Sequence, residues 1–200
     1  MIYKETIKPD HKIIADFISD NSKVLDLGCN DGALLDSLIK NKNVKGFGVD
    51  NSPENINICL KKGLSVLQLD LNKGLASFDD DFFDFVVLNM TLQAVYNPAP
   101  LISDMIRVGK KAVVGFPNFG HWKLLLDLLF TQRMPKTKTL PYEWYDTPNI
   151  RLMTIKDFKV LCEDKEIKIL KEIYLDESGA NIYGSFINWR AVEGIFLISK

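Results

Sequence analysis

Cysteine and histidine are scarce in this chain, which limits the kinds of site that it can form. The 200 residues include three cysteines and two histidines. Cys29, Cys59 and Cys162 are odd in number and widely spaced, which argues against a disulfide scaffold and against a zinc site. We therefore predict no metal centre, and we expect the cysteines to stay reduced.

Long hydrophobic runs and an excess of one charge are also absent. The longest apolar stretch, Leu124–Phe130, is interrupted by Asp127 and is too short to span a bilayer. Lys and Arg number 25 against 26 Asp and Glu, so the chain lacks the basic excess that is typical of nucleic-acid binding. These features predict a cytoplasmic protein with neither a membrane nor a nucleic acid as partner.

Apolar and helical segments alternate along most of the chain. Hydrophobic residues make up 46% of it, enough for one substantial core, and we expect residues 1–200 to form a single domain. Five strand-then-helix alternations predict an α/β fold with a doubly wound, mostly parallel sheet. The expected strands are 24–28, 46–50, 66–70, 83–89 and 112–116, with two more near 167–175 and 191–198.

The most informative segment is Val24–Gly32, which reads as a buried strand that turns through glycines into a helix. Such a turn lets backbone N–H groups approach a ligand, and the positive end of the helix dipole faces the same place. Asp26, Gly28 and Gly32 set the spacing of the turn, and Asn30 stands between the two glycines. Asparagine tolerates the left-handed backbone conformation best among residues with a side chain, so the turn can form with it.

Two further strands end in an aspartate, Asp50 and Asp70. The carboxyl ends of parallel strands meet at one edge of the sheet, where open α/β folds bind their ligands. A glycine turn together with acidic strand ends predicts a nucleoside-binding site, with Asp50 accepting hydrogen bonds from ribose hydroxyls and Asp70 facing an exocyclic amine.

Two cofactors, and a turn without any ligand, are the alternatives. The dinucleotide pattern Gly-x-Gly-x-x-Gly is matched poorly because Asn30 replaces its second glycine, although Asp50 stands at the right distance for NAD. The pattern Asp-x-Gly-x-Gly-x-Gly, which binds S-adenosylmethionine, is matched at Asp26, Gly28 and Gly32. We favour S-adenosylmethionine, or S-adenosylhomocysteine, over NAD.

Residues 117–150 break the alternation, and they form an insertion rich in aromatic residues and proline after the fifth strand. Its part Trp122–Phe130 is expected to be a helix that is apolar nearly all round, so another surface must cover it. The insertion could act as a lid over the cofactor, as an interface with another protein or as a local core.

Candidates for catalysis are few. Asn89, at the end of the fourth strand, and His121, after the fifth, lie on the expected ligand side, and His121 could act as a base near neutral pH. A lone histidine beside a tryptophan more often packs and forms hydrogen bonds. Methyl transfer needs positioning more than a base, so the catalytic residues are left unknown.

Three segments make the chain resemble the methionine biosynthesis protein W family (MetW) of the class I methyltransferase-like superfamily. They are Asn89–Val95, Val114–Trp122 and Leu140–Ile150, and the last two are long and aromatic. The resemblance covers nearly the whole chain. It departs from the family pattern at Asn30, where the family usually has glycine.

The resemblance implies a seven-stranded Rossmann-like sheet of the class I methyltransferase type. It also implies a role in methionine biosynthesis as partner or activator of homoserine O-acyltransferase (MetX), with an S-adenosylmethionine-type site that could report the level of this downstream product. The alternative is an S-adenosylmethionine-dependent methyltransferase acting on an unidentified small-molecule acceptor. The candidate cofactor-binding residues are Asp26, Gly28, Cys29, Asn30, Gly32, Asp50, Asn51, Asp70 and Asn89.

Overall fold

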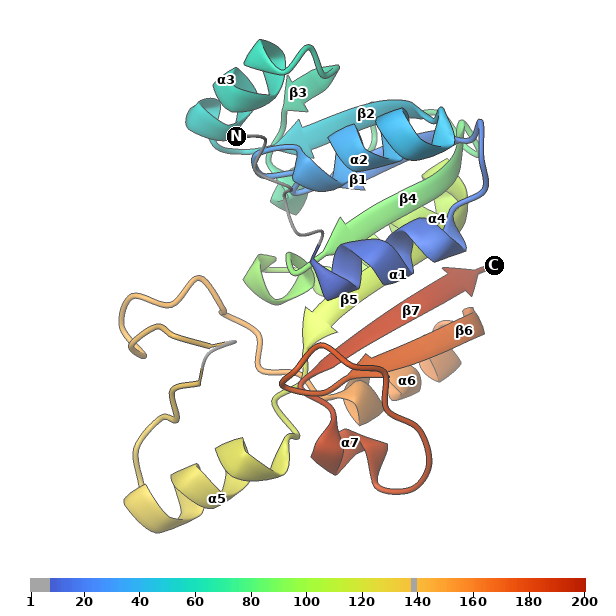
Figure 1. Ribbon diagram of the computed structural model, residues 1–200. Coiled ribbons are helices and arrows are strands. Elements are labelled where there is room, and N and C mark those ends of the chain that lie inside the picture. The colour runs from blue at the N-terminus through green and yellow to red at the C-terminus, as the bar shows by residue number, and fades with distance from the viewer. Residues whose placement is uncertain (1–7, 138–139) are drawn as a thin grey trace.

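The computed structural model describes residues 8–137 and 140–200 and contains one seven-stranded sheet (Figure 1). The strand order is β3-β2-β1-β4-β5-β7-β6. The first five strands are parallel, whereas β7 is antiparallel to both β5 and β6. The strands are β1 (Lys23–Leu27), β2 (Lys45–Asp50), β3 (Val66–Gln68), β4 (Phe83–Asn89), β5 (Gly109–Pro117), β6 (Lys168–Leu175) and β7 (Glu193–Ser199).

Helices cover both faces of this sheet, because its central strands are apolar on both sides. On one face, α1 (Pro9–Phe17) and α2 (Ala33–Lys42) pack over a core that contains Ile14, Leu38 and Val113 (Figure 1). On the other face, α4 (Pro98–Val108) and α6 (Ile155–Asp164) enclose the larger core. The predicted doubly wound α/β fold with seven strands is therefore confirmed.

Local capping signals place several helix starts where the sequence indicates them. The Ser52 hydroxyl accepts a hydrogen bond from the Asn55 N–H at 3.4 Å, and α3 (Pro53–Lys61) begins at the following proline. Thr154 and Asp157 form a reciprocal capping box at the start of α6. These pairs are close in sequence, so the chain encodes them locally.

One local expectation differs from the structure, and the helix α1 begins without a side-chain cap. β3 ends at Gln68, two residues before the expected strand end, because Asp70 instead caps the short helix η1 (Leu71–Lys73). At α1 the cap position is Lys8 and Asp10 lies inside the first turn, where its carboxylate accepts a hydrogen bond from Asn89. A tertiary contact thus takes the side chain that could have capped the helix.

The insertion leaves the sheet after β5. It contains the expected helix, α5 (Trp122–Thr131), which projects away from the sheet, followed by irregular chain that returns to α6 (Figure 1). Leu124 is the one buried residue of α5. A short helix, α7 (Ile187–Arg190), lies between β6 and β7. Across residues 8–137 and 140–200, no helix is both long enough and apolar enough to cross a membrane.

Candidate functional site

The turn between β1 and α2 uses three left-handed residues within five positions. The φ angles of Gly28, Asn30 and Gly32 are 72°, 51° and 76°. Asparagine is among the few non-glycine residues that adopt this conformation readily, so Asn30 keeps the turn that glycine would form. The Gly28 and Cys29 N–H groups donate to the Val49 carbonyl at 2.7 and 3.0 Å, which fixes the turn against the end of β2.

Both glycines of the turn are needed for close packing as well. A Cβ atom on Gly28 would lie 2.8 Å from the Thr91 Cγ2 methyl, in the loop that follows β4. A Cβ atom on Gly32 would lie 2.9 Å from the Cys59 sulfur on α3. The turn is therefore held between two other elements, and a side chain at either position would push it out of place.

Asp50 connects this turn to the next one. Its Oδ2 atom accepts a hydrogen bond from the Asn30 N–H at 2.9 Å. Its Oδ1 atom accepts from the Ser52 N–H at 2.9 Å and from the Asn55 side-chain amide at 3.1 Å. Since a carboxylate has about four acceptor positions, one position on Oδ2 is left for a ligand hydroxyl.

Asp26 lies behind the turn and is almost fully buried. Burial, and to a smaller extent the neighbouring Asp50 carboxylate, raises the pKa of its carboxyl to about 7. Two acids close together favour a positively charged ligand over a negatively charged one.

The Cys29 side chain points away from the ligand side. It packs with Cys59 and Leu64 in a small apolar cluster, and burial is the main reason that the pKa of its thiol is raised. Cys29 thus offers the ligand side its backbone only, as its proposed role requires.

Asp70 lies two residues after the end of β3, where it caps η1. Its Oδ1 atom accepts from the backbone N–H and the side-chain amide of Asn72, at 3.0 and 2.9 Å. These two hydrogen bonds lower the pKa of the Asp70 carboxyl, so it is ionised at neutral pH. No donor from the described residues binds its Oδ2 atom.

A cavity of about 270 Å³ opens where these elements meet. Five of the predicted residues line it: Gly28, Asn30, Asp50, Asn51 and Asp70. Asp26, Cys29, Gly32 and Asn89 are outside its lining and stay predictions. Seven further lining residues are not among the predicted site residues: Asn55, Leu69, Leu71, Asn72, Thr91, Ala94 and Val95.

The missed lining residues follow a rule that the sequence could have supplied. Thr91 comes two residues after β4, and Asn72 comes two residues after Asp70, so both follow strand ends at the ligand edge. Polar residues just after each parallel strand are therefore candidate site residues, as are the acids that end the strands.

The two candidate catalytic residues lie elsewhere. The Asn89 amide donates to Asp10 Oδ2 at 2.7 Å, and its buried Oδ1 has no hydrogen-bond partner among the described residues. His121 is buried at the start of α5, between that helix and the loop 176–178, and burial lowers the pKa of its imidazole. His121 thus packs beside Trp122 rather than facing the cavity.

One wall of the cavity is tied to the end of the insertion. The wall is the short helix η2 (Leu92–Ala94) with its neighbours Thr91 and Val95. The Gln93 carbonyl accepts hydrogen bonds from the N–H groups of Ile150 and Arg151, both at 2.9 Å. The Arg151 guanidinium also donates to the Tyr96 carbonyl, with Nε at 3.2 Å.

Tyr96 completes a path back to the acidic side of the cavity. Its N–H donates to Asn72 Oδ1 at 2.8 Å, and the same Asn72 amide binds Asp70. The end of the insertion and the strand-end acid are therefore joined by a short series of hydrogen bonds.

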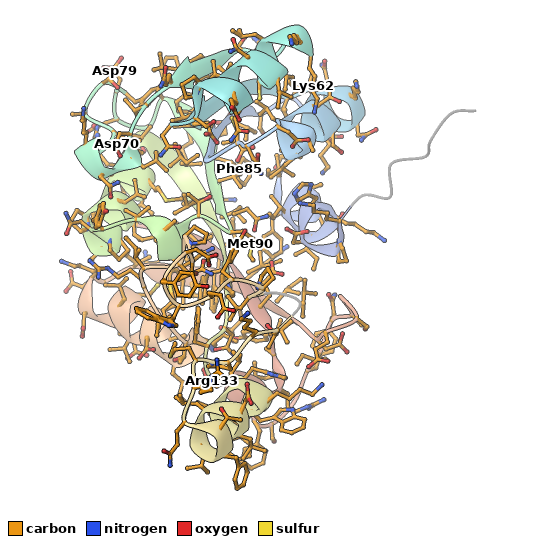
Figure 2. The ribbon with its side chains drawn as sticks, turned by 90° about the vertical axis from the view of Figure 1, so that its left-hand side faces the viewer. Lys62, Asp70, Asp79, Phe85, Met90 and Arg133 are labelled. Carbon is orange, nitrogen blue, oxygen red and sulfur yellow. The ribbon has the colours of Figure 1, made fainter. Side chains whose placement is uncertain are left out.

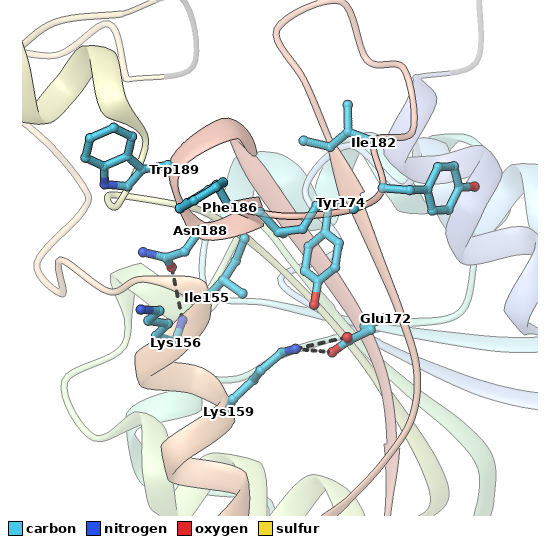
Figure 3. A pocket seen from close by; sticks show the side chains of 12 residues that line it. Ile155, Lys156, Lys159, Glu172, Tyr174, Ile182, Phe186, Asn188 and Trp189 are labelled. Atoms are coloured by element: carbon cyan, nitrogen blue, oxygen red, sulfur yellow. Dashed lines mark hydrogen bonds and ion pairs between the residues drawn. The ribbon is translucent and has the colours of Figure 1, made fainter.

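A larger cavity, of about 890 Å³, lies between α6, β6 and the segment around α7 (Figure 3). Tyr174, Phe186 and Trp189 line it, and the Lys159 ammonium pairs with the Glu172 carboxylate at 2.7 Å across it. Its lining has neither a strand-to-helix glycine turn nor an acid at the end of a strand, which are the features predicted for the nucleoside site. The smaller cavity is the better candidate for the functional site.

The sheet order, the glycine turn and the acidic strand ends define a class of protein, that of the class I S-adenosylmethionine-dependent methyltransferase fold. A solved S-adenosylmethionine-dependent methyltransferase from Archaeoglobus fulgidus superposes with a TM-score of 0.72. The superposition covers 98% of this chain and 94% of that one, at 18% sequence identity. The predicted class of fold is therefore confirmed.

The sequence places the chain more closely. Residues 8–198 match the family described as methionine biosynthesis protein MetW, and the chain belongs to that family. It is 37% identical over 180 residues to the bifunctional methionine biosynthesis protein MetXA/MetW of Rhodopirellula baltica, which is 86% of this chain and 29% of that protein. It is 29% identical over 147 residues to the carboxy-S-adenosyl-L-methionine synthase of Nautilia profundicola, which is 72% of this chain and 60% of that protein.

Proposed function

We propose that this protein is an S-adenosylmethionine-binding partner of homoserine O-acyltransferase (MetX) in methionine biosynthesis. The cavity at the Gly28–Gly32 turn carries the cofactor half of the proposal. The bifunctional relative, whose printed name joins MetXA to MetW, carries the partner half.

The residues around the cavity suit each part of the cofactor. The free acceptor position of Asp50, with Asn51 beside it, would bind ribose hydroxyls, and Asp70 would accept from the adenine amine. The backbone at Gly28 and Asn30 would lie against the rest of the ligand, next to the acidic pair of Asp26 and Asp50. When bound, S-adenosylmethionine would present a sulfonium cation, which such acidic surroundings favour and which S-adenosylhomocysteine lacks.

The wall at η2 supports a regulatory role for the bound cofactor. Thr91, Ala94 and Val95 line the cavity, and Gln93 on the same short helix holds the end of the insertion. A ligand that shifts this wall would also shift Arg151 and the chain before it. S-adenosylmethionine is made from methionine, so this arrangement would let the product of the pathway adjust the acyltransferase.

The second candidate is methyl transfer to an unidentified small-molecule acceptor. The observation that favours it is the fold, which this chain shares with S-adenosylmethionine-dependent methyltransferases. Neither Asn89 nor His121 lines the cavity, so methyl transfer there would depend on positioning alone. Transfer of a labelled methyl group to a small molecule, at a rate that exceeds the control without protein, would favour this candidate.

The first test is a calorimetric titration of the purified chain with S-adenosylmethionine, S-adenosylhomocysteine and NAD. We expect micromolar binding of the first two and none of NAD. The second test is the rate of purified homoserine O-acyltransferase with and without the chain, at zero and at saturating S-adenosylmethionine. A rate that responds to neither the chain nor the cofactor would contradict the regulatory proposal, even if the cofactor binds.

A further inference from the structure

The exposed face of α5 is the most unusual surface of the described chain. Large apolar side chains stand on it in successive turns, and the described residues cover them only in part. Those with at least two fifths of their surface exposed are Trp122, Leu125, Leu126, Leu128, Leu129 and Phe130. Soluble proteins rarely expose a contiguous apolar patch of this kind unless another surface binds it.

The helix α5 is held in place by contacts in its first turn and ends at a defined residue, so its exposed side chains have a defined position. Leu124 is buried against the body, and the Lys123 ammonium pairs with Glu177 at 2.7 Å. Gln132 ends the helix in a left-handed conformation, and its N–H donates to the Leu128 carbonyl at 3.0 Å. The helix therefore presents a fixed row of leucines, in the manner of helices that bind in a groove of a partner.

We propose that the exposed face of α5 is the surface on which homoserine O-acyltransferase docks. This inference rests on the proposed function and adds the place of contact. In the Rhodopirellula baltica relative, a MetW-like part and MetXA belong to one protein, so the two are held together permanently. Permanent complexes have apolar interfaces. The helix α5 fits such an interface because Lys123 and Asp127 are its only charged residues.

The position of α5 is compatible with cofactor exchange in the complex. Asp70 beside the cavity lies in the upper part of the molecule in Figure 2, and Arg133 just after α5 lies in the lower part. An acyltransferase bound to α5 would therefore leave the mouth of the cavity open. The cofactor would act on the docked partner through the insertion and its link to η2.

The test compares two pairs of substitutions in the full chain. Leu129→Gln with Phe130→Gln removes the two most exposed apolar residues of α5, at 67% and 78% exposure. Leu60→Gln with Val160→Gln removes exposed apolar residues from α3 and α6, at 55% and 53%, and serves as the matched control. Glutamine is a good helix former, so both pairs should fold, and circular dichroism with a cofactor titration would verify this.

We expect the α5 pair to weaken binding to purified homoserine O-acyltransferase by at least tenfold, while the control pair and cofactor binding stay unchanged. If wild type binds and the α5 pair binds equally well, the docking surface is wrong while the proposed function stands. If wild type binds no acyltransferase, the proposed partnership fails together with this inference. If wild type self-associates and the α5 pair only makes it monomeric, the face binds a second copy, and the inference is overturned.

Discussion

Aromatic residues behave in opposite ways in the two regions of this protein. In the sheet region, Phe116, Phe158 and Phe196 pack against one another with ring centroids 4.7 to 5.7 Å apart, and all three are fully buried. In the insertion, Trp144 and Tyr145 contact each other at 5.6 Å but are 72% and 70% exposed. Aromatic residues thus form part of the core in the sheet region and part of the surface in the insertion.

The largest effect should come from the core. Phe158→Ala should lower the free energy of unfolding by about 3–5 kcal/mol, because it leaves a cavity beside Phe116 and Phe196. Phe130→Ala, the matched change in the insertion, should alter it by less than about 0.5 kcal/mol, because the ring is exposed. Urea unfolding measures both. A large loss for Phe130→Ala would mean that α5 is packed in solution.

The next effect is on the pH dependence of the free energy of unfolding, and it concerns Glu193 at the start of β7. Burial raises the pKa of the Glu193 carboxyl to about 8, so between pH 5 and 8 the folded state holds a proton that the unfolded state has lost. The free energy of unfolding should therefore fall as pH rises through this range. Glu193→Gln should reduce the slope by up to about 1.4 kcal/mol per pH unit.

Denaturation series at several pH values would measure this slope in both proteins. Some slope should remain in the variant, since the pKa of Asp26 is also raised, to about 7. Equal slopes for the variant and wild type would show that Glu193 titrates normally in the folded state.

A smaller effect is expected on the affinity for S-adenosylmethionine, which should depend on Asp50 more than on its neighbour Asn55. Asp50→Ala should weaken S-adenosylmethionine binding by about 1.5–3 kcal/mol, because it removes a charged acceptor and frees the Asn30 N–H. Asn55→Ala is the control, since it removes one donor to Asp50 and leaves the carboxylate in place. Calorimetric titration should show little loss for Asn55→Ala. An unchanged affinity for a folded Asp50→Ala would exclude Asp50 from the site.

The smallest expected effect concerns the link between the two regions. Arg151→Ala should remove the guanidinium contact to the Tyr96 carbonyl and weaken the influence of S-adenosylmethionine on the acyltransferase by about fivefold, or roughly 1 kcal/mol of coupling. Cofactor affinity of the free chain should hardly change. Arg151→Lys is the comparison that keeps the charge but loses the planar fork. Full regulation in Arg151→Ala would place the coupling elsewhere.

Much of the fold and part of the site could be predicted because their signals are local. The run Phe83–Asn89 and the pair Ser52-Pro53 specify a strand and a helix start within a few residues. The prediction was wrong at the end of β3, because Asp70 accepts a hydrogen bond from the nearby Asn72 N–H and caps η1, so that a second local pattern ends the strand early. That residues 1–200 form a single domain stays a prediction.

Local sequence patterns specify the alternation of strands and helices and the glycine turn, because apolar periodicity and left-handed residues act over short distances. The tertiary structure holds Asp50 against that turn, pairs Asn89 with Asp10, 79 positions away, and packs Thr91 over Gly28. It also leaves the exposed face of α5 covered only in part by the described residues. Such outcomes depend on which elements meet after the crossovers are made, and no local pattern carries that information.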